Sequence, residues 1–141
     1  MRLQASIEAL LVMAAFLSLL LALMPVINKA ATVVSFASAA ARHQQAFDEL
    51  CSDAADAFVL GQGNKFVSPQ RLPTDAALNF NDSTTTLYYS FNASNLSKTF
   101  SRRLGFTLAL NNRTLPKGSL VFEVANDGGV AFTASGNTTT G

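Results

Sequence analysis

The sequence predicts an α+β fold, in which one long N-terminal helix packs on a small antiparallel β-sheet of about four strands. Residues 9–27 contain no Asp, Glu, Lys, Arg or His, and apolar residues within 47–58 recur at three- and four-residue steps. After Gly63, short segments rich in aromatic and β-branched residues alternate with turn residues. A chain of 141 residues has room for one long helix and one small domain.

The first part of the predicted helix, residues 4–28, is long enough to cross a membrane. Its uncharged stretch reaches about 28 Å at about 1.5 Å per residue, close to the thickness of the hydrocarbon core. The three residues before it are too few for the basic region of a secretory signal peptide, and a small-residue cleavage pattern at 37–39 lies far downstream. The apolar segment is therefore expected to stay on the mature protein.

Beyond Pro25, which should kink the helix because it lacks a backbone N–H, an amphipathic helix is expected over residues 29–60. Small residues at 37–41 suit close helix packing. Gly61 and Gly63 are expected to end the helix. One face of this part is apolar and the other acidic; the two sets are Phe47, Leu50, Cys51, Ala54, Ala55 and Phe58, and Asp48, Glu49, Asp53 and Asp56.

Residues 61–141 are expected to form the β-rich domain, which covers the apolar face of the 47–58 helix. Strands are predicted at 87–91, 106–110, 120–124 and 130–133, the last two joined by an Asn-Asp-Gly-Gly turn. Pro69, Pro73 and Pro116 are assigned to connecting loops. The small polar tail, 136–141, is expected to fray.

A single carboxylate, Glu8, stands at the head of the apolar run, where an ionisable group costs about 2.5–3.5 kcal/mol to insert and usually marks function. It belongs to the pattern Gln4-x-Ser6-x-Glu8-x-Leu10, which resembles the class III signal peptide of archaeal type IV pilin-like proteins. The resemblance implies that a prepilin peptidase cuts between Leu3 and Gln4. The leader is then 1–3, and Glu8 becomes the fifth mature residue, a hallmark of type IV pilins.

The resemblance covers about twenty-five residues, and Pro25 falls where a proline often sits in related pilin helices. The chain departs from the family in its leader of three residues and in Leu3, which replaces the small residue usual before the cut. A cut there would create an α-ammonium at Gln4, and Glu8 of one subunit could pair with it on a neighbour. The alternative is that Glu8 is a helix-start acid at the cytoplasmic interface, with Ser6 or Gln4 near the cap.

The charged residues indicate how the chain is oriented across the membrane, and they do not form the basic cluster typical of nucleic-acid-binding proteins. Arg2 precedes the span, which favours a cytoplasmic N-terminus and places residues 28–141 outside. The net charge is +1, and the one adjacent basic pair, Arg102 and Arg103, is expected on a solvated strand or loop.

Five Asn-x-Ser/Thr sequons agree with an exterior location, and all lie beyond the helix. These candidate N-glycosylation sites are Asn81, Asn92, Asn95, Asn112 and Asn137. The alternative is that Asn, Ser and Thr simply form the polar surface and turns of a β-domain.

The sequence indicates no catalytic site, cofactor or metal. His43, the one histidine, is assigned to a solvated polar patch of the helix. Cys51, the one cysteine, is expected to be a buried thiol, with an intermolecular bridge as the alternative. Asp82 and Asp127 are interpreted as turn residues in preference to calcium ligands.

Three functions remain open, none of them centred on nucleic acid. The leading hypothesis is a pilin: a membrane precursor that is cut, extracted by a pilus assembly machinery and polymerised with identical or related subunits into a surface filament. The second is a minor pilin or pseudopilin whose β-domain binds a surface or partner. The third is a permanently anchored surface protein that keeps residues 1–3.

Overall fold

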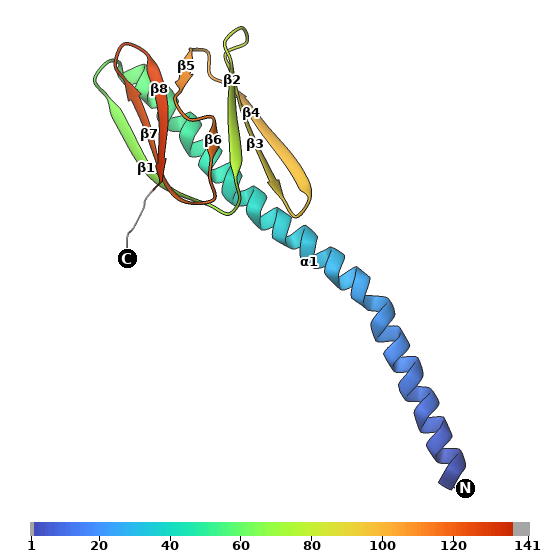
Figure 1. Cartoon of the computed structure of the whole chain (residues 1–141). Coiled ribbons are helices and arrows are strands. Elements are labelled where there is room, and N and C mark those ends of the chain that lie inside the picture. The colour runs from blue at the N-terminus through green and yellow to red at the C-terminus, as the bar shows by residue number, and fades with distance from the viewer. Residues whose placement is uncertain (1, 137–141) are drawn as a thin grey trace, which may run out of the picture. The chain divides into compact units, whose positions relative to one another are not determined.

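The computed structural model describes residues 2–136, with side chains from Ser6 onward. Helix α1 (Arg2–Leu60) comes first and eight strands follow (Figure 1). The chain divides into two compact units, Met1–Ser35 and Phe36–Gly141, so α1 contributes to both. A helix against an antiparallel-rich β-domain is the predicted α+β fold, which is confirmed.

The strands of the second unit form two four-stranded sheets, not one. The first sheet has the order β1-β7-β8-β5 and the second the order β4-β3-β2-β6. All pairs are antiparallel except β5 with β8. The strands are β1 (Lys65–Leu72), β2 (Ala76–Asn81), β3 (Thr86–Ala93), β4 (Leu96–Arg103), β5 (Leu108–Leu110), β6 (Thr114–Leu115), β7 (Gly118–Asn126) and β8 (Val130–Gly136).

The strand prediction located parts of β3, β5, β7 and β8 and missed β1, β2, β4 and β6. The β7–β8 hairpin has the expected turn at 127–129, and β3 contains the predicted 87–91 segment. The prediction for 106–110 was too long, since β5 is only Leu108–Leu110. Pro69 lies in β1 and not in a loop; β1 is an edge strand, where a missing N–H leaves the sheet's ladder intact.

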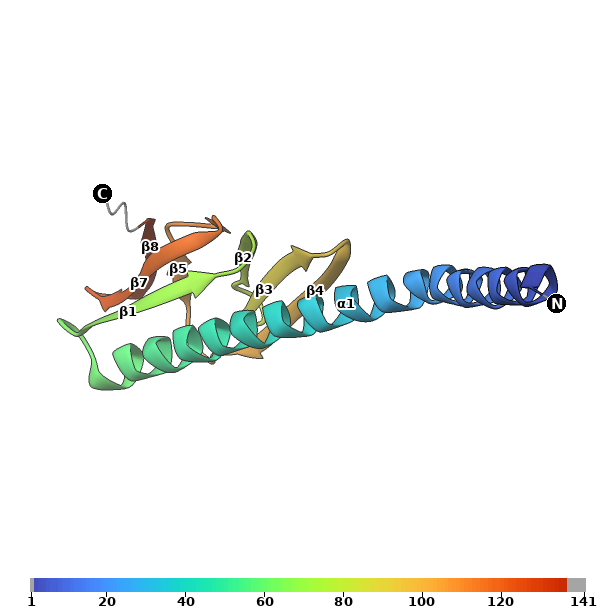
Figure 2. The ribbon, with the colours of Figure 1, turned by 90° about the horizontal axis from the view of Figure 1, so that it is seen from below.

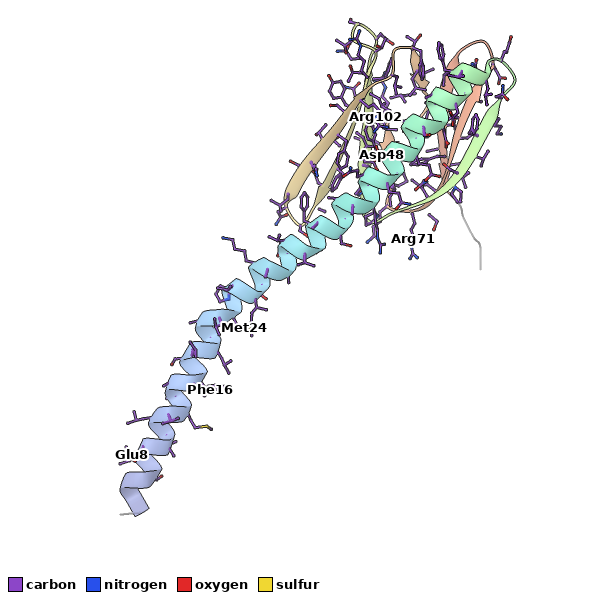
Figure 3. All side chains as sticks on the ribbon, turned by 180° about the vertical axis from the view of Figure 1, so that it is seen from behind. Glu8, Phe16, Met24, Asp48, Arg71 and Arg102 are labelled. Atoms are coloured by element: carbon purple, nitrogen blue, oxygen red, sulfur yellow. The ribbon has the colours of Figure 1, made fainter. Side chains whose placement is uncertain are left out.

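The apolar face of residues 36–60 of α1 is covered by both sheets. Phe47, Leu50 and Ala54 are at most 3 % exposed, and they belong to one cluster with Tyr89 of β3 and Phe122 of β7. The strands gather on one side of this part of α1, whose opposite face is open (Figures 2 and 3). The domain core is therefore completed by the helix.

The end of α1 is fixed by specific contacts. Gly61 has φ +83°, a conformation in which glycine commonly ends helices. Asn64 Nδ2 donates to the carbonyls of Leu60 and Gly61, both at 3.0 Å. Buried Asn126 of β7 donates from Nδ2 to the Ala57 carbonyl at 3.0 Å. These bonds satisfy carbonyls that a helix end leaves free and tie it to the β7–β8 hairpin.

Two side chains on the helix differ from prediction. Phe58 is 53 % exposed, although its ring stacks on Phe106 at 4.5 Å, and Ala57 is buried in its place. His43 is not solvated: it is fully buried, because it lies four residues before Phe47 and seven before Leu50 and so shares their face. The expected burial of the Cys51 thiol is confirmed.

Candidate functional site

The first candidate site is the apolar part of α1. The described residues contain one helix apolar enough to cross a membrane, with a mean hydropathy of 2.7 in its most apolar window and none of that window buried. Leu10, Phe16 and Leu21 are 58–71 % exposed. A helix with this much exposed apolar surface is compatible with membrane anchoring.

Polar groups within this segment are satisfied locally. Ser18 Oγ donates to the Ala14 carbonyl at 2.8 Å, and Thr32 Oγ1 donates to the Asn28 carbonyl at 3.0 Å. Such bonds to the carbonyl four residues earlier let hydroxyls sit in an apolar environment. Glu8 cannot form this kind of bond, because an ionised carboxylate has no hydrogen to donate to a backbone carbonyl.

The other residues of the motif occupy the start of the same helix. Ser6 and Glu8 are exposed, and both Leu3 and Gln4 are helical, with side chains outside the described part of the chain. Pro25 lies inside α1, which continues on both sides of it. The cut before Gln4, the Glu8 pairing and the kink at Pro25 stay predictions.

The sequons occupy different surroundings on the domain. Asn92 on β3 and Asn95 in the β3–β4 turn are exposed. Asn81 Oδ1 accepts from the Ser83 N–H at 3.0 Å, and Asn112 Oδ1 accepts from the Ala134 N–H at 3.0 Å. Asn137 lies outside the described residues, as do the other residues of the 137–141 tail. If the domain is glycosylated, we expect Asn92 and Asn95 to be the most accessible acceptors.

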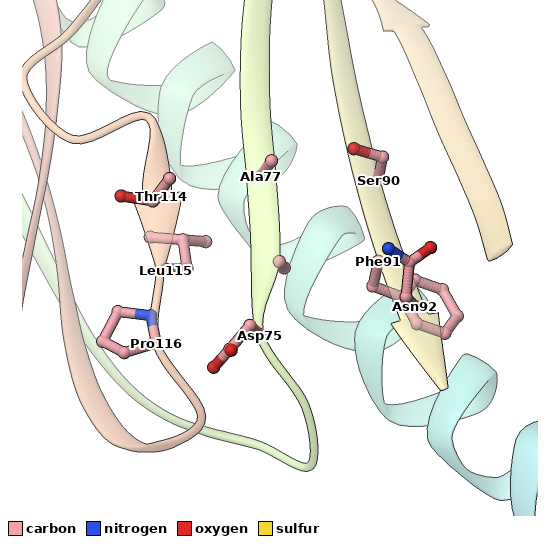
Figure 4. A pocket seen from close by; sticks show the side chains of 9 residues that line it. Asp75, Ala77, Ser90, Phe91, Asn92, Thr114, Leu115 and Pro116 are labelled. Atoms are coloured by element: carbon pink, nitrogen blue, oxygen red, sulfur yellow. The ribbon is translucent and has the colours of Figure 1, made fainter. Parts of the chain in front are cut away.

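A cleft of about 520 Å³ opens where β2, β3 and β6 lie side by side (Figure 4). Phe91 and Leu115 form its apolar part, and Ser90, Asn92 and Thr114 contribute polar groups. Asp75 also lines the cleft, but its Oδ1 already accepts from the Lys117 N–H at 2.7 Å. The cleft therefore combines apolar surface with hydroxyl, amide and carboxylate groups.

The buried polar cluster around His43 joins α1 to the second sheet, and sequence reasoning missed it. Nδ1 of His43 lies 2.7 Å from Tyr89 Oη, and Nε2 lies 2.9 Å from Thr74 Oγ1. The imidazole stacks on Phe91 with ring centroids 4.1 Å apart. Burial lowers the pKa of His43 to about 4, so the ring is neutral at neutral pH. The helical spacing from Phe47 was the signal that could have revealed it.

The remaining titratable candidates show no reactive geometry. Burial is the main reason that the pKa of the Cys51 thiol rises to about 11, so the thiol is protonated and shielded. Asp82 and Asp127 lie in separate hairpin turns. Among residues 2–136, no three His, Cys, Asp or Glu side chains gather as metal ligands do.

Charge on the domain is divided between the helix and one strand. Residues 36–60 of α1 carry Asp48, Glu49, Asp53 and Asp56 against Arg42 and neutral His43, a net charge of −3. The four strands of the β4-β3-β2-β6 sheet carry Lys98, Arg102 and Arg103, all on β4, and no acid, a net charge of +3. One ion pair between described residues joins the two groups, Arg102 to Asp48 at 2.7 Å (Figure 3).

Comparison of the chain with protein-family models, with curated proteins and with solved structures gave no match.

Proposed function

We propose that this protein is a structural subunit of a type IV pilus-like surface filament, held first in the membrane and then polymerised through the apolar part of α1. The observation that carries the proposal is the exposure of every large apolar side chain from Ile7 to Val34 on a helix whose later residues do pack on their own domain. In a precursor, lipid covers this surface. In a filament, the same helices of other copies cover it.

Glu8 supplies the register in this account. An unpaired carboxylate among packed apolar helices is costly, whereas a carboxylate paired with the α-ammonium of a neighbouring Gln4 offsets much of that cost. Only one axial offset between neighbouring helices brings the two charges together. Cleavage by a prepilin peptidase creates the ammonium, so processing and assembly are coupled.

Replacing Glu8 tests the proposal. Glu8→Ala should abolish filaments in the sheared cell-surface fraction while the protein persists in the membrane, as measured by electron microscopy and immunoblotting. Ser18→Ala, in the same apolar segment, is the matched control and should leave filaments intact, since it removes only a local hydrogen bond. Normal filaments from Glu8→Ala would contradict the charge pairing.

The cleft between β2, β3 and β6 favours a second candidate, a minor pilin-like binding subunit, because it is a concave surface that offers both apolar and hydrogen-bonding groups. Stoichiometry separates the two candidates: a main structural subunit dominates purified filaments, whereas a binding subunit is scarce in them. A chain found only in membranes, monomeric and with residues 1–3 intact, would instead be an anchored surface protein.

A further inference from the structure

Strand β4 (Leu96–Arg103) is a cationic edge strand that contacts β3 and, through Phe100 and Arg102, residues Phe47 and Asp48 of α1, and its outer edge pairs with no described strand. It pairs with β3 on one side only, and all of its residues except half-buried Phe100 are exposed. Arg102 is paired with Asp48, whereas Lys98 lies 5.0 Å from the centre of the Phe100 ring and Arg103 is in no ion pair among the described residues. Lys98 and Arg103 therefore present exposed positive charge to any surface that lies against β4.

The open face of α1 carries the complementary charge. A groove of about 670 Å³ runs along it from Ala41 to Asp53. Glu49 accepts from Gln70 Nε2 at 2.6 Å, and Asp53 accepts from Ser68 Oγ at 3.3 Å, so neutral donors hold both carboxylates. Partial burial is the main reason that the pKa of Asp53 is raised, and Glu49 and Asp56 add to the effect. A cation placed against Asp53 would relieve the repulsion between its carboxylate and those of Glu49 and Asp56.

The distribution of charge selects which surfaces can meet. Two β4 edges would place cations against cations, and the other charged edge, β1, carries Lys65 and Arg71 and no acid. Like charges on neighbouring strands are destabilising. The groove on α1 is the described surface whose charge opposes that of β4.

We propose that the β4 edge of one copy docks on the α1 groove of a second copy, with Lys98 and Arg103 facing Glu49 and Asp53. The contact joins two different surfaces, so every copy can use both at once and the contact propagates from copy to copy. The inference rests on the proposed filament function and adds to it a domain–domain contact, independent of the apolar part of α1.

Cross-linking of the full chain in membranes and sheared filaments tests the contact. Ser52 in the groove and Ser101 on β4 are both exposed, so Ser52→Cys with Ser101→Cys is a mild change. In a Cys51→Ala background, a short bis-maleimide should join this double variant into a ladder of dimers, trimers and larger species. Each single variant should stay monomeric, as should Ser52→Cys with Ser135→Cys, whose second site is on β8.

Two results would overturn the proposal: dimers from Ser101→Cys alone, which indicate a β4–β4 contact, or no ladder from the double variant. Filaments without a ladder would refute this contact and leave the filament function standing. A ladder in membranes without filaments at the surface would support the contact and refute the filament function. Neither ladder nor filaments would refute both.

Charge reversal gives a second test, which asks whether the ladder depends on the opposite charges of the two surfaces. Lys98→Glu with Arg103→Glu, in the double-cysteine chain, should reduce the ladder about tenfold, and adding Glu49→Lys with Asp53→Lys should restore it. Arg71→Glu with Lys117→Glu makes the same change in net charge elsewhere on the domain and should leave the ladder unchanged. An equal loss in this control, or no restoration, would contradict the proposed pairing.

Discussion

Residues 7–34 and residues 36–60 belong to one helix, yet the apolar side chains of the first segment are exposed and most of those of the second are buried. The first segment is predominantly apolar on every side, apart from Glu8 and Lys29, and its residues are exposed, whereas the second has one apolar face buried under two sheets and one acidic face left open. A helix gains most of its stability from packing. The comparison teaches that the second segment is stabilised by packing within its own domain, whereas the first has no such packing among the described residues and is compatible with membrane anchoring.

The largest effect should come from truncating a buried residue of the second segment. Leu50 is fully buried, so Leu50→Ala should lower the free energy of unfolding of the domain by about 3 kcal/mol through lost burial and a cavity. Leu17→Ala, at an exposed position of the first segment, should change it by less than about 0.5 kcal/mol. Thermal unfolding of the full chain in detergent, followed by circular dichroism, measures both. Equal losses of stability from Leu50→Ala and Leu17→Ala would contradict the difference between the two segments.

Acid should weaken the second segment through His43. The folded-state pKa of about 4 lies below the usual 6.5, so the folded state binds fewer protons than the unfolded state. The stability contributed by neutral His43 is complete above about pH 6.5 and is lost as pH falls toward 4, by up to about 3 kcal/mol. Unfolding measured across this range should show the loss in the wild-type chain relative to His43→Phe, which has no group to titrate. Parallel pH profiles would contradict this assignment.

Loss of the Asn126 contact should loosen the end of the second segment. Asn126→Ala leaves the buried Ala57 carbonyl without its side-chain donor, at a cost of about 1–3 kcal/mol. Hydrogen exchange should rise in the last turns of α1 before it rises around Leu50. Asn64→Ala, at a more exposed position, is the matched control with a smaller expected effect. Unchanged exchange at residues 54–60 would show that the bond does not hold the helix end.

The smallest effect should come from the exposed ion pair. Arg102 and Asp48 are each nearly half exposed, so water and salt screen their attraction. Arg102→Ala should lower the free energy of unfolding by less than about 1 kcal/mol, and the difference should shrink in high salt. A larger effect would mean that the Arg102 guanidinium, whose central carbon lies 5.9 Å from the centre of the Phe47 ring, also stabilises the second segment through that ring.

The sequence was sufficient to predict the helix, its end at Gly61, the β7–β8 hairpin and the burial of Cys51, because each follows from local patterns. It was insufficient for β1, β2, β4 and β6. Lys65–Leu72 contains a proline and Leu96–Arg103 is polar on both faces, so neither edge strand shows apolar alternation. The burial of His43 was not predicted, because histidine is a polar residue type and was assigned to the surface, although its spacing from Phe47 places it on the buried face of the helix. Its partners Thr74 and Tyr89 come from segments that only the tertiary fold brings together.

The central claim is that other copies cover the apolar segment after it leaves the membrane. N-terminal peptide and intact-mass spectrometry on membrane and sheared-surface fractions tests it most directly. The account predicts a chain that begins at Gln4 in the sheared fraction, with the full apolar segment still attached. An unprocessed chain that begins at Met1 and is confined to membranes would contradict it, because Glu8 would then have no α-ammonium at Gln4 to pair with.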